Sequence, residues 1–502
     1  MIALLWLLKI SLYSIKARSE LSIHIPKFSR LHLLGLLFIA LVILQIVPLP
    51  PKILRIVSPK TYWLYAEAIP GYDGHNLEIK SIEEKFFALA TSVEMETNQK
   101  KNLMKERDYA AKVQENMELA KQGKDNSSWS MRQSSWKPIS IHPYRTREML
   151  FKIISFFLVF LVVTEHFKTR EKVDKILKTL LVIGTFEAFY GLLEYLSDHQ
   201  HIFFFEKIYN RDSATGTFVN PNHFAGFLEM TLPIGLGLFF YLIQKSEWKS
   251  ETFREKVLSL SHPLKLKCLL VFLCISIIFA GLLLSYSRSG LIVCVFSLIF
   301  LFSSAIFWYR KRRTQLSLIM LILILIATPF INHGFQKMRE GFESLDIELS
   351  GEKTRMAALK DSLHIFPDFP ILGSGFGTFE YAFLIHSSHD WGVRYDFAHN
   401  DYLQILAETG IAGALLVTLF IILILRLAYR KIRKHRTERL SIFFGLTASF
   451  IAILGHEFTD FNLYIYSNAL LFSVVLALII IEGGGKGNQE SVLERKIIVN
   501  GF

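Results

Sequence analysis

Cysteine is scarce in this chain: only three occur in 502 residues, and Cys268, Cys274 and Cys294 all lie inside apolar runs. No pair lies in a polar loop, which excludes a disulfide framework and the cysteine spacing of a zinc site. Charged residues are nearly absent from several stretches of about 18–24 residues, each long enough to cross a hydrocarbon core about 30 Å thick. With 51% hydrophobic residues, the composition excludes an ordinary soluble protein.

The net charge of +12 is compatible with nucleic-acid binding when taken alone. The basic residues, however, gather in short segments between the apolar runs. Arg310-Lys311-Arg312-Arg313 and Arg430-Lys431-Ile432-Arg433-Lys434 are the clearest of these. Such clusters are typical of the cytoplasmic loops of membrane proteins, so the charge indicates membrane topology and no nucleic-acid partner.

The apolar runs predict an all-α polytopic bundle of about eleven spans. Residues 268–308 are apolar except for the knot at 285–290, and this length is about twice what one span requires. The knot is therefore predicted to be a hairpin turn. Residues 1–16 lack a basic n-region and a small-residue cleavage site, so they are interpreted as a span and not as a signal peptide. The spans are expected at 1–16, 31–50, 148–166, 174–197, 223–245, 266–286, 289–309, 315–333, 402–428, 439–457 and 464–482.

The short basic loops fix the expected orientation, because cytoplasmic loops are enriched in Lys and Arg. The remaining connections and both long loops then face outward. The second long loop carries the residues that could do chemistry, while the polar insert at 76–126 shows none. The predicted organisation is N-terminal spans at 1–50, an outer loop with a polar helical insert at 51–147, a membrane core at 148–333, a large outer catalytic loop at 334–400, C-terminal spans at 401–482 and a cytoplasmic tail at 483–502.

The unusual polar residues all fall on the predicted outer side, although up to about 240 residues separate them. Polar side chains are costly near hydrocarbon, so a gathering of them at one membrane face indicates a functional site. The segments concerned are the turn around Arg288, the start of the fifth span at Asn220–His223, Arg355 and His399 of the long loop, and the last outer turn from His456 to Asp460.

Arg288 and Arg355 are the candidate anion-binding groups. A guanidinium binds phosphate oxygens through two parallel hydrogen bonds, which an ammonium cannot do. The alternatives are an interfacial Arg288 that merely reaches for water and a solvated Arg355 on a loop surface. The glycine run 373–377 resembles a phosphate cradle only weakly, and a tight turn that packs the loop onto the membrane domain is the favoured interpretation.

His399 is the candidate catalytic residue. It precedes a long apolar helix, and Asn400 or Asp401 is expected to cap that helix. Asp401, Gln404 and Glu408 recur at helical spacing and are predicted to form one polar stripe that lines a cavity. Because imidazole titrates near neutral pH, His399 could accept a proton from a hydroxyl group or orient it. The alternative is a capping or interfacial histidine without a chemical role.

Glu187 and Glu194 lie seven residues apart on one face of the fourth span. Carboxylates within a membrane span suggest a proton-coupled transporter, such as a lipid-linked glycan flippase. A flippase should carry cations through the depth of the bundle, whereas here they gather at one face. Structural pairing of the two glutamates, with Tyr190 or with another helix, is the favoured interpretation.

Several of these motifs together resemble the O-antigen ligase and polymerase superfamily of bacterial membrane glycosyltransferases. His399-Asn400, nine further residues, Gly410, two more and Gly413 resemble the signature of that family at every fixed position. The turn at 287–290 resembles its Ser-Arg-Gly motif with one extra serine. The remaining matches are Thr217-Phe218 through Asn222 to Ala225, Arg355 with Pro370–Gly377, and His456–Phe461, so that the likeness covers about residues 150–482.

The resemblance implies a metal-independent, inverting glycosyltransferase with a GT-C-like helical fold and no cofactor. It implies a glycan donor on undecaprenyl diphosphate at the periplasmic face of the bacterial inner membrane. A ligase would use a sugar hydroxyl of the lipid A core as acceptor, and a polymerase would use another lipid-linked glycan. The expected roles are His399 as acceptor base or orienter, Arg288 and Arg355 as the diphosphate clamp, and Asn222, Asn400, Gln404, His456 and Asp460 as supporting residues.

Overall fold

The computed structural model describes residues 30–69, 72, 135–197, 201–246, 263–308, 325–326, 328–329, 358–387, 395–434 and 439–483. The predicted span 1–16, most of 315–333, the insert at 76–126, Arg355 and the tail beyond residue 483 lie outside the described residues. The chain divides into two compact units. One is Ile46–Ile141, and the other comprises Met1–Gln45 with His142–Phe502.

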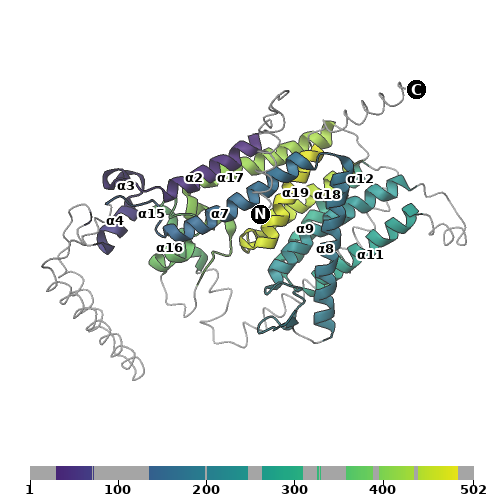
Figure 1. The fold of residues 1–502 in the computed structure, drawn as a ribbon. Helices are drawn as coiled ribbons and strands as arrows, with labels where there is room; N and C mark the ends of the chain where they lie inside the picture. The colour runs from purple at the N-terminus through teal and green to yellow at the C-terminus, as the bar shows by residue number, and fades with distance from the viewer. Residues whose placement is uncertain are drawn as a thin grey trace, which may run out of the picture. The chain divides into compact units, whose positions relative to one another are not determined.

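The larger unit is a bundle of long apolar helices (Figure 1). Seven described helices are long and apolar enough to cross a membrane, and α2 and α18 are shorter apolar helices. The all-α prediction is confirmed, since the strands of the described chain are the two-residue pair β1 (His201–Ile202) and β2 (Phe205–Glu206). The nine helices are α2 (Arg30–Ile46), α7 (Pro143–His166), α8 (Arg170–Leu196), α9 (Pro221–Lys245), α11 (Pro263–Leu284), α12 (Arg288–Trp308), α17 (Asp401–Lys434), α18 (Leu440–His456) and α19 (Tyr466–Gly483).

The predicted hairpin is present, because α11 ends at Leu284 and α12 begins at Arg288. Helix starts follow ordinary capping chemistry. The Asn220 side chain accepts a hydrogen bond from the backbone N–H of Asn222 before α9, and proline occupies the first helical position. These caps fix where each apolar run becomes helical on the side where the candidate residues lie.

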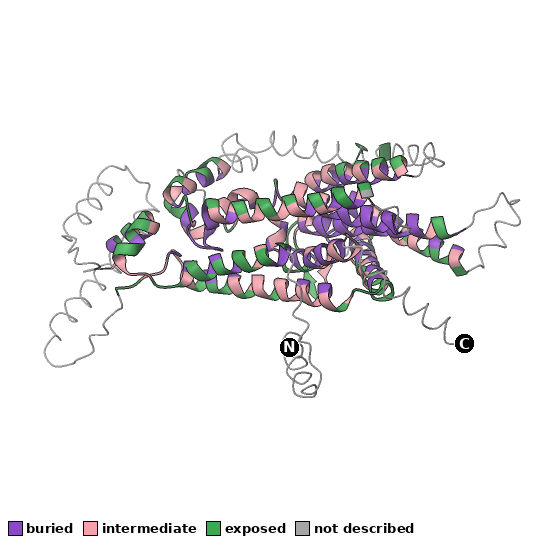
Figure 2. Ribbon diagram, turned by 90° about the horizontal axis from the view of Figure 1, so that it is seen from above, coloured by how far each residue is buried: buried purple, intermediate pink, exposed green. Residues whose placement is uncertain are grey.

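The core of the bundle forms where α9 packs against α18. Figure 2 shows buried residues concentrated in the middle of the bundle and exposed residues on its outer helices. Of the most apolar window of α9, 78% is buried inside the protein. Glycine permits this contact: a Cβ on Gly445 would lie 2.3 Å from the carbonyl oxygen of Pro233, and one on Gly237 would lie 2.6 Å from that of Ser441. The two backbones therefore approach as closely as small residues allow in membrane proteins.

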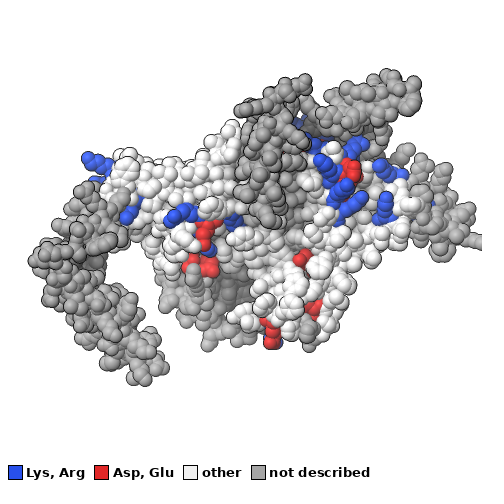
Figure 3. Space-filling view, in the orientation of Figure 1, with Lys and Arg blue, Asp and Glu red and all other residues white. Residues whose placement is uncertain are grey.

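Three helix ends that the charge pattern places on the same side of the membrane lie close together in the structure. Arg439, whose side chain is 6% exposed, pairs with Asp174 and with Glu482 at 2.7 Å each. These residues come from the start of α8, the start of α18 and the end of α19, all of which are predicted to be cytoplasmic ends. In Figure 3, charged side chains sit in small groups, and most of the described helix surface in view is uncharged, as a lipid-facing surface requires.

The smaller unit contains α3 (Pro51–Val57) and α4 (Pro59–Ala68). An isolated bridge pairs Leu49 with Lys137, and the Thr61 hydroxyl donates to the carbonyl of Ile139 at 3.0 Å. Buried threonine and serine thus hold the two ends of the 51–147 loop together. Burial, and to a lesser extent the neighbouring Tyr72, raises the pKa of the Tyr65 hydroxyl to about 12.

Helix α17 is broken at Gly410, which the sequence did not indicate beyond its place in the signature. Gly410 has φ of 62°, and a Cβ there would lie 2.4 Å from the backbone of Ile371. The break leaves carbonyls and N–H groups without helical partners, and the loop that contains Gly373 and α15 (Ile365–Asp368) supplies them. Ser374 N donates to the carbonyl of Ala407, and Ile411 N donates to that of Pro370.

Two buried side chains complete this junction. Gln45 of α2 donates to the carbonyls of Leu372 and Glu408 and accepts from Phe376 N. The Glu408 carboxylate accepts from Gly377 N at 2.8 Å and from the Tyr464 hydroxyl at 2.8 Å. Each of these hydrogen bonds satisfies a buried polar group that would otherwise need a water molecule as its partner. The glycine run is therefore a packed turn, as favoured from the sequence, and not a phosphate cradle.

We expect Gly410→Ala to lower the melting temperature of the detergent-purified protein. In a regular helix, alanine is more stable than glycine by about 1 kcal/mol. Here the positive φ and the clash with Ile371 reverse that sign. Ala414→Gly, four residues further along the regular part of α17, provides the comparison and should show only the ordinary glycine cost. An unchanged or higher melting temperature for Gly410→Ala would contradict the assigned break.

Candidate active site

The turn between α11 and α12 is held on α9 by Ser287. Its hydroxyl donates to the Asn222 side-chain oxygen at 2.8 Å. A Cβ on Gly290 would lie 2.7 Å from that of Ala225, so the glycine lets the turn lie directly on α9. Arg288 is the first residue of α12 and is half-buried. One side of Arg288 is thus fixed to the start of α9.

The other side of Arg288 is fixed by Ser289 through a buried chain of polar groups. The Ser289 hydroxyl lies 3.2 Å from Nε2 of His456 at the end of α18. The Nδ1 atom of His456 lies 3.1 Å from both carboxylate oxygens of Glu229 on α9. His456 and Glu229 are both fully buried side chains. This carboxylate–imidazole–hydroxyl chain orients the imidazole and ties α9, α12 and α18 together.

Asp460 connects this region to His399. Its carboxylate, 1% exposed, lies 3.3 Å from Nδ1 of His399 and 3.8 Å from Nε2 of His223. Asp460 follows the end of α18, and its own N–H donates to the carbonyl of His456. The ring of Phe461 meets the rings of both His399 and His223 edge-on, with centroids 5.0 and 4.8 Å apart. Residues from α9, α18 and the long loop therefore meet at one carboxylate.

The surroundings of Asp460 favour its ionised form. Burial by itself would raise its pKa, but the imidazoles of His223 and His399 and the charge of His456 together lower the pKa of Asp460 below its ordinary value. The contact with this carboxylate orients the imidazole of His399 through Nδ1. Among the described residues, the hydrogen bonds of His399 involve only Nδ1, so Nε2 is the atom that can face a substrate.

The backbone around His399 is held in an uncommon conformation. His399 has φ of 50°, in the left-handed region that non-glycine residues rarely adopt and that often marks a functional position. Asn400 supports it from both ends: its side-chain oxygen accepts from Leu403 N, and its nitrogen donates to the carbonyl of Phe458. Asp401 N donates to the carbonyl of Glu457. The predicted cap is thus Asn400, and α17 begins directly behind His399.

Gln404 supports the same segment, but the predicted polar stripe needs a correction. The oxygen of Gln404 accepts from Ala398 N, and its nitrogen donates to Glu408. Gln404 and Glu408 thus bind the loop backbone. Of the three residues, Asp401 lines the cavity between α2, α7, α17 and α19. These side chains pack against the loop because the break at Gly410 leaves backbone groups that need hydrogen-bond partners.

The glutamates of α8 are paired structurally. Glu187 accepts from the backbone and hydroxyl of Thr217, and the buried Glu194 pairs with Lys207 at 3.1 Å. The suggested partner Tyr190 instead donates to the carbonyl of His201. Both carboxylates therefore hold the loop that leads into α9, and neither forms part of a path along the membrane span.

Glu229 was not singled out in the sequence, and His223 was noted only as part of the segment Asn220–His223. Glu229 lies seven residues after Asn222 in an otherwise apolar span, and that isolation is the signal by which Glu187 and Glu194 were noticed. His223 follows Asn222 directly, but only the fold shows that its ring approaches Asp460. Arg355, the second predicted clamp residue, lies outside the described residues.

The fold and site define a polytopic helical membrane protein with a polar site at one end of its bundle. Residues 270–418 match the family model described as O-Antigen ligase. This segment contains Arg288, Arg355 and His399, and the match supports the resemblance to the O-antigen ligase and polymerase superfamily. The family supports a glycosyltransferase-like enzyme that uses lipid-linked glycan and glycan acceptor substrates. No curated protein matches the chain.

We expect Glu229→Gln to reduce glycosyl transfer at least about tenfold, a barrier change of ~1.4 kcal/mol. The neutral amide no longer orients His456, and the turn that presents Arg288 loses the support that His456 gives to Ser289. The comparison variants are His456→Gln and the double variant that combines Glu229→Gln with His456→Gln. Because Glu229 is expected to act through His456, the double variant should be little worse than the poorer single variant. Additive losses would contradict this chain of contacts.

Proposed function

We propose that this protein transfers a glycan from undecaprenyl diphosphate to a sugar hydroxyl of the lipid A core, at the periplasmic face of the bacterial inner membrane. The observation that carries the proposal is the meeting of His399 with Asp460, in the turn that also places His456 on Ser289 beside Arg288. A proton acceptor and an anion-binding group are thereby held at the same end of the bundle.

Arg288 is proposed to bind the diphosphate of the donor, together with Arg355. Its turn is fixed through Ser287 and Ser289, so the guanidinium is presented from a rigid backbone. The leaving group gains negative charge as the glycosidic bond breaks, and fixed cations stabilise that charge without rearranging. On this proposal the arginines do the work that a metal ion performs in other transferases.

His399 is proposed to activate the acceptor. As the acceptor oxygen attacks the anomeric carbon, the bond from that carbon to the diphosphate oxygen breaks, and the hydroxyl proton passes to Nε2 of His399. The lipid diphosphate leaves with the bonding electrons, and attack from the opposite face inverts the anomeric centre. Ionised Asp460 on Nδ1 stabilises the resulting imidazolium. The start of α17 directs its backbone dipoles toward the same region.

The acceptor distinguishes the two activities of the superfamily. A ligase uses the lipid A core, and a polymerase uses a second lipid-linked glycan. Both need the same donor chemistry, so Arg288 and His399 serve either reaction. We place the ligase first and keep the polysaccharide polymerase as the alternative. The supporting residues Asn222 and Asn400 act on the backbone in both cases.

The test uses purified protein in proteoliposomes with a glycan on undecaprenyl diphosphate and EDTA throughout. Wild-type protein should transfer the glycan to lipid A core, and His399→Ala should lose at least about 99% of that activity, within the range of general-base catalysis. Product is measured by gel mobility and mass spectrometry. Elongation without core acceptor would indicate the polymerase. Inhibition by EDTA that Mg²⁺ reverses, or normal transfer by folded His399→Ala, would contradict the proposed chemistry.

Arg288→Lys should lose most activity and raise the KM for the donor, because an ammonium cannot form the two parallel bonds of a guanidinium. Arg147→Lys, on the exposed start of α7, is the control and should behave as wild type. Both variants keep the charge, so the comparison isolates the geometry of the cation at Arg288. Wild-type kinetics for Arg288→Lys would exclude the clamp.

A further inference from the structure

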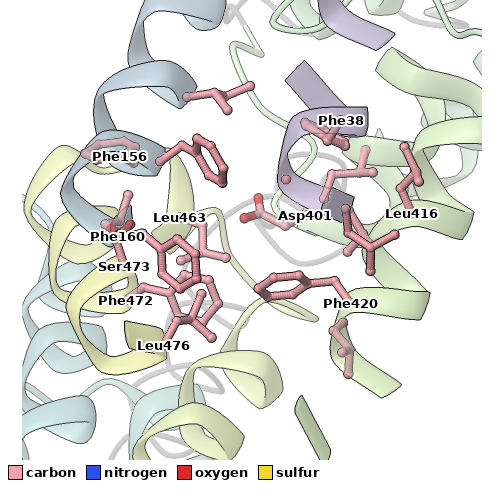
Figure 4. Close-up of a pocket in the computed structure, with 18 of the residues that line it drawn as sticks. Phe38, Phe156, Phe160, Asp401, Leu416, Phe420, Leu463, Phe472, Ser473 and Leu476 are labelled. Atoms are coloured by element: carbon pink, nitrogen blue, oxygen red, sulfur yellow. Dashed lines mark hydrogen bonds between the residues drawn. The ribbon is translucent and has the colours of Figure 1, made fainter. Parts of the chain in front are cut away.

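A cavity of about 310 Å³ lies between α2, α7, α17 and α19, within the larger unit. Figure 4 shows the side chains of Phe38, Phe156, Phe420 and Leu476 pointing into it from these helices. Its walls are almost entirely aromatic and aliphatic. An apolar cavity of this kind does not hold water well and binds apolar molecules instead. Its volume lies at the lower end of the range for small-molecule sites.

Helices α7, α17 and α19 are long and apolar enough to cross a membrane, and α2 is a shorter apolar helix, so hydrocarbon is expected around the cavity. Phe157 lies against Gly35 so closely that a Cβ on this glycine would meet the ring at 2.5 Å, which closes one wall between α2 and α7. On α17, Leu416 lines the cavity, whereas the neighbouring Leu415 is 56% exposed. A molecule that fills the cavity must therefore be apolar over most of its length, as a lipid chain is.

One end of the cavity is polar and lies next to the candidate catalytic residue. Asp401, two residues after His399, points its carboxylate into the cavity (Figure 4). Glu457, whose carbonyl accepts from Asp401 N, lines the same end, as does Tyr402. Burial and the nearby carboxyl of Asp401 raise the pKa of Glu457. An amphiphilic molecule would thus place its chain among the helices and its polar part toward His399.

The cavity and the candidate clamp use different helices. None of the residues that line the cavity belongs to α8, α9, α11 or α12, whereas Arg288 begins α12 and its turn rests on α9. A transferase that joins two lipid-borne substrates needs a place for each hydrocarbon chain. The donor headgroup is assigned to the α9–α12 side, so the chain on the His399 side belongs to the other substrate.

We propose that the cavity between α2, α7, α17 and α19 binds a hydrocarbon chain of the acceptor lipid and guides the acceptor toward His399. This inference rests on the proposed function, because it presupposes an acceptor carried on a lipid. It assigns a lipid-binding role to a cavity whose apolar walls the motifs of the sequence did not indicate. The acceptor chain, and not only its sugar, would then contribute to recognition.

The test compares Leu416→Trp, which fills the cavity, with Leu415→Trp, which adds the same bulk to the outer face of α17. Each protein is assayed with acylated core acceptor and with the same core glycan after removal of its acyl chains. Leu416→Trp should raise the KM for the acylated acceptor about tenfold or more, because displaced methylenes lose favourable burial. Its KM for the deacylated acceptor and for the donor should stay unchanged. Leu415→Trp should match wild type.

Cross-linking gives a second measurement that does not depend on turnover or on the variant. An acylated acceptor with a diazirine in its chain, added without donor, should label Phe420, Leu476 or their neighbours in wild-type protein. A higher donor KM in Leu416→Trp, equal KM values for both acceptors in wild type, or labelling elsewhere would overturn the assignment. Labelling of the cavity without transfer to either acceptor would instead reject the proposed function while leaving a lipid site.

Discussion

Asp460 is the polar junction on which the geometry of this site depends. It lies in the turn after α18, and its buried carboxylate contacts the imidazoles of His399 from the long loop and His223 from α9. A lone buried carboxylate would be costly, and the two imidazoles and the nearby charge of His456 keep it ionised. The same interactions that make the charge tolerable thus fix the position of the candidate base. The contacts that stabilise the fold here are therefore the ones that shape the candidate site.

The break in α17 shows the same principle for the backbone. Hydrocarbon offers no hydrogen bonds, so a broken helix must find partners inside the protein. At Gly410 the long loop inserts its own backbone, and Gln45 and Glu408 complete the junction. The loop thereby becomes part of the bundle and does not lie merely above it. His142 stacks on Tyr381 with centroids 4.1 Å apart, which fixes α16 (Phe379–His386) to α7 as well.

Much of this arrangement could be predicted from the sequence, because it follows from local or periodic signals. Apolar runs locate the spans, the polar knot at 285–290 locates the hairpin, and Asn400 caps α17 as expected. Long-range partners could not be predicted. Nothing local indicates that Glu229 meets His456, 227 residues away, or that Gln45 fills a gap beside Glu408. Such pairs are set by packing of the helices, which the order of residues does not reveal.

The division of the bundle also bears on how one fold can serve two activities. On the proposed function, groups that face the donor diphosphate need only complement charge, and the turn around Arg288 is held on α9 through Asn222 and on α18 through His456. The acceptor side is proposed to use different parts, namely the start of α17 and the cavity next to Asp401. Changes on that side can alter the acceptor without disturbing the clamp. Differences between ligases and polymerases are therefore expected among residues around α2, α7 and α17, while the donor side stays the same.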